Sequence, residues 1–311
     1  MIAGMHRHET APRPPAFTAQ RILRISRVVA DLERAESFYR NALGFRTVAK
    51  GVVGAGALTA FDLPDALAEE AVMRLGNEEI ALVRFPAQGR PYPPDSRSND
   101  LWFQHLAVVV RDMDAAHAHL SVVQGWRPIS EGGPQLLPPS NGGVRAFKFR
   151  DPDGHPLELL WLPPGHGRPI WREQPSDTLF LGIDHSAISV ASTHRSLRFY
   201  EALGLGRIDR SLNLGTAQER LDGLPGARVR VTGLRPASGA GPGLELLAYR
   251  PPGRTTGATD LSNRLTDWVT VAVNPAHGVL PRAVQDPDRH RLLLVAQGAD
   301  VTGLPACGPM T

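Results

Sequence analysis

Two long segments of the chain alternate between an apolar run and an amphipathic run. ILRISRVVA (22–30) is apolar at most positions, and DLERAESFYRNALGF (31–45) follows it with apolar residues at helical spacing. The same order returns in IDHSAISVA (183–191) and STHRSLRFYEALGL (192–205), again with a Phe-Tyr pair and a Leu-Gly stop. Each segment therefore predicts a strand followed by a helix, and the chain contains an internal repeat.

Further pairs of segments extend the repeat. They are FQHLAVVVRDMDAAHAHL (103–120) with DWVTVAVNPAHGVL (267–280), DPDGHPLELLW (151–161) with DPDRHRLLLVA (286–296), and RFPAQGRPYP (84–93) with YRPPGRTTGA (249–258). They predict four units joined by linkers rich in Pro, Gly and Ser, at 21–95, 100–165, 179–252 and 264–298. The fourth unit is shortened. Residues 1–20 lack a signal-peptide pattern and are expected to form a disordered leader.

Composition narrows the function classes. The chain has 311 residues, of which 42% are hydrophobic and 21% charged, as expected for a globular protein of about two domains. No apolar run is long enough for a membrane span. The net charge is +3, and the arginines are scattered among acidic residues, so nucleic-acid binding is not expected. A single cysteine, Cys307, excludes an intramolecular disulfide and favours a cytoplasmic location.

The repeated unit resembles the vicinal oxygen chelate superfamily, which includes glyoxalase I, epimerases, extradiol dioxygenases and bleomycin-resistance proteins. The resemblance rests on the first strand IDHSAISV, the helix ending FYEALG and the last strand DPDGHPLEL. It implies an α+β fold of four βαβββ modules, the fourth shortened, paired into two curled-sheet cups. In that family a divalent metal lies in a cup, and its ligands come from the first and last strands of the paired units.

The repeat alignment gives two columns of candidate ligand positions. The first-strand column holds Arg24, His105, His185 and Val269, and a slip of one residue would replace Val269 by Trp268. The last-strand column holds Ala81, Glu158, Glu245 and Leu293. Units two and three keep a His and a Glu each, and units one and four keep neither.

These columns predict that modules two and three share the metal cup, as in fused, duplicated glyoxalases, and that modules one and four form a metal-free structural half. The predicted ligands are His105, Glu158, His185 and Glu245. Two imidazoles and two carboxylates suit one divalent ion, which could be Fe, Ni, Co, Mn or Zn. Taken singly, each has a plainer interpretation: a strand His is often a buried core residue, and Glu245 could face outward on an alternating strand.

Three functions follow from this site. The first is base-assisted proton transfer of the glyoxalase or epimerase type on a small substrate chelated through vicinal oxygens, with Glu158 or Glu245 as the base. The second is Fe(II)-dependent ring cleavage of the extradiol type, which requires one carboxylate to turn away and leave a facial triad. The third is metal-free binding of a small molecule, as in resistance proteins.

The residues around the substrate are less constrained by the sequence. The candidates for substrate contact are Trp126, Asn141, Arg145, Phe147, Lys148, Tyr200 and Arg230. His155 lies in the DPDGHP turn, and we interpret it as a turn residue. The expected partner is a small molecule with neighbouring oxygens, and the expected state is a monomer or a homodimer.

Overall fold

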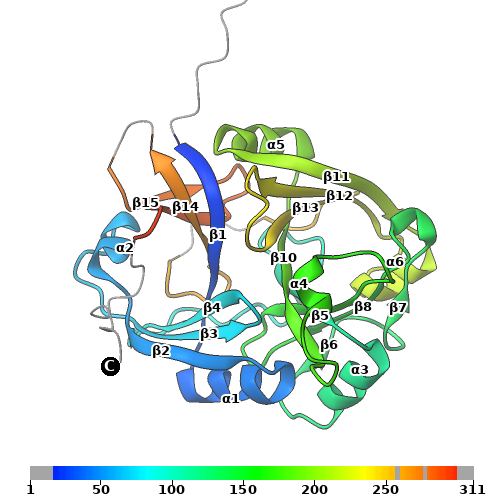
Figure 1. Cartoon of the computed structure of the whole chain (residues 1–311). Helices are drawn as coiled ribbons and strands as arrows, with labels where there is room; N and C mark the ends of the chain where they lie inside the picture. Colours follow the sequence, from blue (N-terminus) through cyan, green and yellow to red (C-terminus); the bar gives the residue numbers. More distant parts are fainter. Residues whose placement is uncertain (1–16, 256–259, 276–278, 300–311) are drawn as a thin grey trace, which may run out of the picture.

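The computed structural model describes residues 17–255, 260–275 and 279–299, and its strands form two curled β-sheets with helices packed outside them (Figure 1). The predicted α+β architecture is confirmed. Strand β1 (Phe17–Val28) begins inside the segment expected to be a leader, because Thr18 and Ala19 pair with Asn274 and Val273 of an antiparallel neighbour. The prediction of a leader was therefore wrong for residues 17–20. Residues 1–16 and Cys307 lie outside the described residues.

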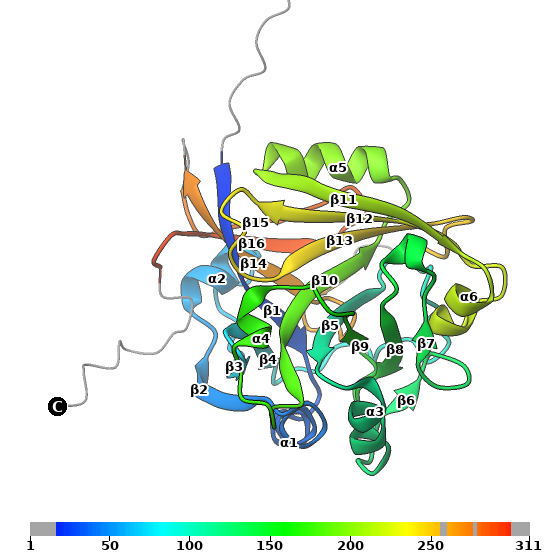
Figure 2. The same cartoon turned by 45° about the vertical axis from the view of Figure 1, so that its right-hand side comes forward.

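One sheet contains the strands of the predicted units two and three. Its order is β11 (Leu205–Leu214), β12 (Arg228–Pro236), β13 (Gly243–Tyr249), β10 (Phe180–Ser189), β5 (Gln104–Val110), β9 (Pro156–Trp161), β8 (Arg145–Arg150) and β6 (Arg127–Pro128), with β7 (Gln135–Leu136) paired to β8. The two units meet where β10 and β5 pair in antiparallel fashion. Figure 2 shows the two ends of this sheet curling toward each other.

The other sheet contains the strands of the predicted units one and four. Its order is β15 (Arg282–Gln285), β16 (Arg291–Ala296), β14 (Trp268–Pro275), β1, β4 (Glu78–Arg84), β3 (Glu69–Leu75) and β2 (Arg46–Val52). Within 264–298, the described residues form three strands and no helix. Strand pairing also corrects the repeat alignment. Ser26 of unit one and Ala187 of unit three are equivalent positions; Ser26 lies opposite Trp268, and Ala187 lies opposite His105. The position equivalent to His105 is therefore Trp268 and not Val269.

The helices that follow the first strands begin at side-chain caps. They are α1 (Leu32–Leu43), α3 (Met113–Ser121) and α5 (Thr193–Ala202), and their caps are Asp31, Asp112 and Ser192. Each cap oxygen accepts a backbone N–H of the first turn, which stabilises the helix start. The remaining helices are α2 (Ala55–Ala60), α4 (Pro169–Arg172), α6 (Thr216–Asp222) and the 3₁₀ turn η1 (Pro139–Asn141). In the described part of the chain, no helix is long and apolar enough to span a bilayer.

Strand alternation separates the core from the concave face of the nine-stranded sheet. Leu106 and Val108 of β5 pack in the main core, as do Leu157 and Leu159 of β9. Successive strand residues point to opposite faces, so the residues between them, including Glu158, turn toward the concave face. The apolar core therefore fixes which face of each strand is available for a site.

Candidate metal centre and its cavity

Four side chains lie close together on the four central strands of the nine-stranded sheet. His105 lies on β5, Glu158 on β9, His185 on β10 and Glu245 on β13. In unit two and in unit three, the first and last strands are parallel neighbours, with Ala107 opposite Glu158 and Ala187 opposite Glu245. Each of these two units thus places one imidazole and one carboxylate on the concave face.

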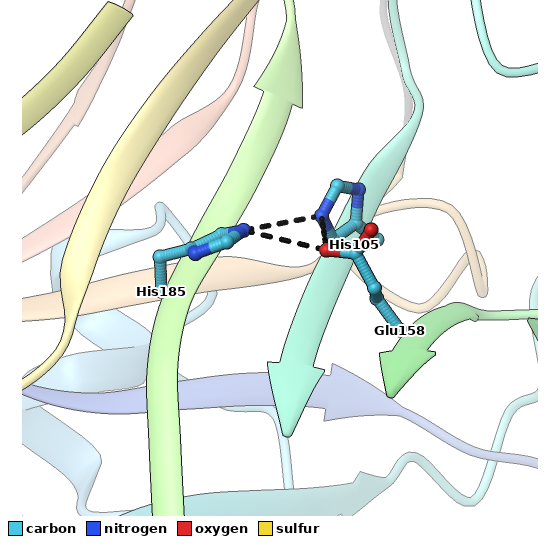
Figure 3. Close-up of side chains that lie close together, drawn as sticks. All are labelled: His105, Glu158 and His185. Carbon is cyan, nitrogen blue, oxygen red and sulfur yellow. Dashed lines mark hydrogen bonds and ion pairs between the residues drawn. The ribbon is translucent and has the colours of Figure 1, made fainter. Parts of the chain in front are cut away.

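The distances between these groups are short (Figure 3). The Nε2 atoms of His105 and His185 are 3.3 Å apart, and Glu158 Oε2 lies 3.2 Å from the first and 3.7 Å from the second. Glu245 Oε2 is 3.4 Å from His185 Nε2. The first three side chains are at most 7% exposed, whereas Glu245 is 25% exposed and lies nearer the opening.

The donor set fits a divalent ion. One ligand atom from each of His105, Glu158 and His185 can be chosen so that all lie within 4.8 Å of one another. Ligand atoms about 2.1 Å from one ion are about 3 Å apart when adjacent and about 4.2 Å apart when opposite, which matches these separations. Buried carboxylates beside two imidazoles also need a compensating positive charge. The role of the four residues as ligands stays a prediction.

Asp184 orients one of the imidazoles, and sequence reasoning missed it. His185 Nδ1 donates to Asp184 Oδ2 at 2.9 Å, and Asp184 Oδ1 accepts from Arg235 Nη2 at 3.3 Å. A ring nitrogen that donates to a carboxylate leaves Nε2 as the ligand atom and makes it more basic. The signal was present in the sequence, since Asp184 immediately precedes the candidate ligand.

The titration of these groups reflects burial and mutual contact. Burial raises the Glu158 pKa, but His105 and Lys148 outweigh it and lower the pKa to about 2. Burial lowers the pKa of His105 to about 4. Burial also lowers the His185 pKa, but Glu245 and other carboxylates outweigh it and raise the pKa to about 9. Burial raises the Glu245 pKa to about 7, against the opposing effect of His185.

The four groups lie in a cavity of about 390 Å³. One wall, from the side of β8 and β9, is largely apolar and consists of Leu137, Val144, Ala146, Leu160 and Leu162. The opposite wall, on β11, is polar and consists of Asp209, Arg210, Ser211 and Asn213. Helix α6 contacts β7, β8 and β11 and so lies between the two walls. Such a cavity suits a small molecule with one apolar and one polar side.

Two predicted substrate residues line this cavity. Lys148 is 3% exposed, and its Nζ donates to Asp222 Oδ1 at 2.8 Å. Its charge is therefore compensated within the protein rather than held for an acidic substrate. Asn141 of η1 donates through Nδ2 to Asn213 Oδ1, which joins the 3₁₀ turn to the polar wall.

Three other predicted substrate residues have partners within the protein instead. Trp126 packs edge-on against Phe147, which is itself 1% exposed in the main core. Arg145 forms a bidentate pair with Asp114 at 2.7 and 2.9 Å. Core packing therefore accounts for Trp126 and Phe147, and ion pairing accounts for Arg145. None of the three lies in the lining of the cavity, and their role as substrate contacts stays a prediction.

Tyr200 and Arg230 also lie outside the lining of this cavity, and their role as substrate contacts stays a prediction. Tyr200 is buried, and its hydroxyl donates to Asp286 Oδ2 at 3.2 Å. Tyr39 makes the equivalent bond to Asp151 Oδ2 at 3.0 Å, so the repeated Tyr joins each helix to a DPD turn. Arg230 lines a separate cavity near the start of α5.

Comparison with known proteins places the chain in a family. Residues 21–159 match the Glyoxalase/Bleomycin resistance protein/Dioxygenase superfamily. A 2-epi-5-epi-valiolone epimerase from Actinomyces sp is 32% identical over 149 residues, which are 45% of this chain and 79% of that protein. The chain belongs to this superfamily.

Solved structures of similar shape agree with that placement. Glyoxalase I from Zea mays aligns with a TM-score of 0.56 at 16% identity over 89% of this chain and 92% of that chain. A putative dioxygenase from Bacillus subtilis aligns with a TM-score of 0.55 at 15% identity over 90% of this chain and 86% of that chain. At these identities the likeness shows a shared superfamily fold, which hosts several chemistries.

Proposed function

We propose that this superfamily member is a metal-dependent enzyme that catalyses base-assisted proton transfer, of the epimerase type, on a small substrate held through two neighbouring oxygens. The observation that carries the proposal is the presence of two carboxylates in one cavity with the imidazoles: Glu158 lies beside both His105 and His185, and Glu245 lies beside His185. The epimerase from Actinomyces sp supports this reaction class over the other chemistries of the fold.

The two carboxylates have different environments, which favours different roles. Glu158 is within 3.7 Å of both imidazoles and has a pKa of about 2, so it stays charged and suits a ligand. Glu245 contacts His185, is more exposed, and has a pKa of about 7. A base works best when its pKa is close to the operating pH, so we assign the base to Glu245.

In the proposed reaction the Glu245 carboxylate accepts the proton from the carbon next to the substrate carbonyl. The electron pair of the broken C–H bond moves onto the carbonyl oxygen. When that pair returns to carbon, a proton from a solvent water molecule adds to the opposite face and inverts the carbon, and the proton on Glu245 passes to solvent. His105, Glu158 and His185 would hold the divalent ion, which when bound supplies Lewis-acid stabilisation of that oxygen. The apolar wall limits access of water, and the polar wall offers hydrogen-bond partners for hydroxyl groups.

The test is exchange of the substrate proton in D₂O, followed by ¹H NMR with 2-epi-5-epi-valiolone and simple α-hydroxyketones. We expect Glu245→Gln to lower the exchange rate by about 10²–10⁴-fold while the metal content is kept. Glu158→Gln should lower metal content and exchange together. Glu201→Gln, which removes an exposed carboxylate of α5 outside the cavity, serves as the control. Undiminished exchange in Glu245→Gln would refute the assignment of the base.

A second function has its own supporting observation. The tightest group of donors is His105, Glu158 and His185, two imidazoles and one carboxylate, which is the composition of an Fe(II) facial triad. If Glu245 does not bind the ion, positions for substrate and O₂ stay open. Oxygen uptake with catechols by the anaerobically Fe(II)-loaded protein tests this alternative, and small-molecule binding that survives chelation would instead favour the metal-free binding function.

A further inference from the structure

A row of charged residues crosses the seven-stranded sheet, away from the metal centre. In the strand register, Arg46 on β2 lies opposite Arg74 on β3, Arg74 lies opposite Glu79 on β4, and Glu79 lies opposite Arg24 on β1. Directly paired residues on neighbouring strands point to the same face of a sheet. These four side chains therefore share one face, and with Arg21 they line a cavity of about 560 Å³ at the β3–β4 turn.

Positive charge exceeds negative charge in this cavity. Glu79 is shared, accepting from Arg74 Nη2 at 2.6 Å and from Arg24 Nη2 at 3.0 Å. Burial raises the Glu79 pKa, but the two arginines outweigh it and lower the pKa, so Glu79 is charged. The only other carboxylate near the row is Glu70, 3.8 Å from Arg24 Nη1, among the ion pairs of the described residues. Four guanidinium groups thus face two carboxylates.

Two of the four arginines remain available. Arg21 is exposed, and its side chain makes one long contact, 3.4 Å from Nη2 to the carbonyl of Asn77. Arg46 is exposed and forms no ion pair with any described carboxylate, although it stands directly opposite Arg74, where like charges are destabilising. Arg24 is 6% exposed, and its Nε has no hydrogen-bond partner in the described part of the chain. An anion in the cavity would reduce the repulsion between Arg46 and Arg74 and would accept a hydrogen bond from Arg24 Nε.

The cavity occupies an informative position in the repeat. Arg24 of unit one occupies the strand position that His185 occupies in unit three. Arg24 lies opposite Glu79, and Ser26, two residues further along, lies opposite Ala81. In the same way His185 lies opposite Gly243, and Ala187 lies opposite Glu245. Unit one therefore presents guanidinium groups where unit three presents the imidazole end of its cup. Guanidinium groups cannot bind a cation, but their planar arrangement of donors matches the oxygens of a phosphate or a carboxylate.

We propose that this cavity is a second ligand site, which binds a small molecule through a phosphate or carboxylate group. Arg24 and Arg74 are fixed by Glu79 and form the floor of the site, and the exposed Arg21 and Arg46 contact the anion from the rim. The two sources of such an oxyanion differ in charge and shape, so inorganic phosphate and propane-1,2,3-tricarboxylate serve as separate probes.

The test is titration of the full chain with each probe at constant ionic strength, followed by calorimetry and by the ¹H–¹⁵N signals of the arginine Nε groups. We expect saturable binding of at least one probe and a shift of the Arg24 Nε–H signal. The tighter probe then identifies the class of anion.

The double variant Arg21→Gln/Arg46→Gln should weaken this binding by about tenfold or more, since two charge-assisted contacts are lost. Both residues are exposed, so the fold should be unaffected. Arg198→Gln, which removes an exposed arginine from α5, is the matched control and should leave the affinity unchanged. Absence of saturable binding, or equal affinities in the double variant and the wild type, would overturn the proposal.

Discussion

Replacing Asp184 by Asn tests whether the metal centre depends on the orientation of His185. Asp184 Oδ2 accepts the Nδ1–H of His185 at 2.9 Å. A hydrogen bond to a charged group contributes about 1.5–3 kcal/mol, and a neutral one contributes about 0.5–1.5 kcal/mol. The amide oxygen of the substituted side chain can still accept the bond but lacks the charge, so the loss is about 1.4 kcal/mol, or about tenfold in metal affinity.

The assay is competition for Zn²⁺ or Co²⁺ with a chromogenic chelator, followed over a pH series. His185 has a pKa of about 9, so protons compete with the metal below that pH. The substitution weakens this competition because Asp184 is one cause of the raised pKa. The full difference in affinity should therefore emerge only above about pH 9 and shrink as the pH falls.

Asp177→Asn is the matched control for Asp184→Asn. It removes an exposed carboxylate that lies outside the lining of the cavity. We expect a change of less than about threefold in affinity for this control. Equal affinities of the two variants at high pH would refute the orienting role of Asp184.

Three further predictions concern stability and the bound ion. Burial lowers the pKa of His155, but Asp151 outweighs it and raises the pKa to about 8. The charged His155 therefore adds roughly 2 kcal/mol to the free energy of unfolding below pH 6.5, and this contribution is lost as the pH rises through 8. Urea unfolding should show this loss in the wild type and in His290→Gln but not in His155→Gln; a parallel loss in all three would contradict it. Lys148→Met should destabilise the protein by about 3 kcal/mol because it leaves the Asp222 carboxylate buried and less compensated, and Lys148→Met/Asp222→Leu should recover most of that loss in the same assay. Chelation should abolish proton exchange while circular dichroism stays unchanged, and re-addition of metal should restore the rate; exchange that persists without metal would exclude the proposed chemistry.

The sequence allowed prediction of the parts of the site that follow from the repeat. Because strands alternate and the repeat aligns, the columns that contain His105, Glu158, His185 and Glu245 could be read before the structure, and the structure brings these side chains into one cavity. The one-residue slip at Val269 arose because the fourth unit is shortened and its described residues offer no helix as an anchor. Register in such a strand depends on its partners, which the sequence does not display.

The residues around the candidate ligands could not be predicted in the same way. Tyr200 and Arg145 carry polar groups that suit a substrate, but each is satisfied by a distant carboxylate, Asp286 or Asp114. The polar wall on β11 was missed because Asp209 shows no special spacing relative to the candidate ligands. Such contacts depend on how strands far apart in the chain curl toward each other, and this is a property of the folded sheet.

The central claim is that the second and third units together bind one divalent ion. Anomalous diffraction from crystals soaked in Co²⁺ or Zn²⁺, collected at the absorption edge of the metal, tests it directly. We predict one strong peak about 2.1 Å from the Nε2 atoms of His105 and His185 and from a Glu158 oxygen. A saturated crystal with no peak there, or with its strongest peak in the seven-stranded sheet, would contradict the claim.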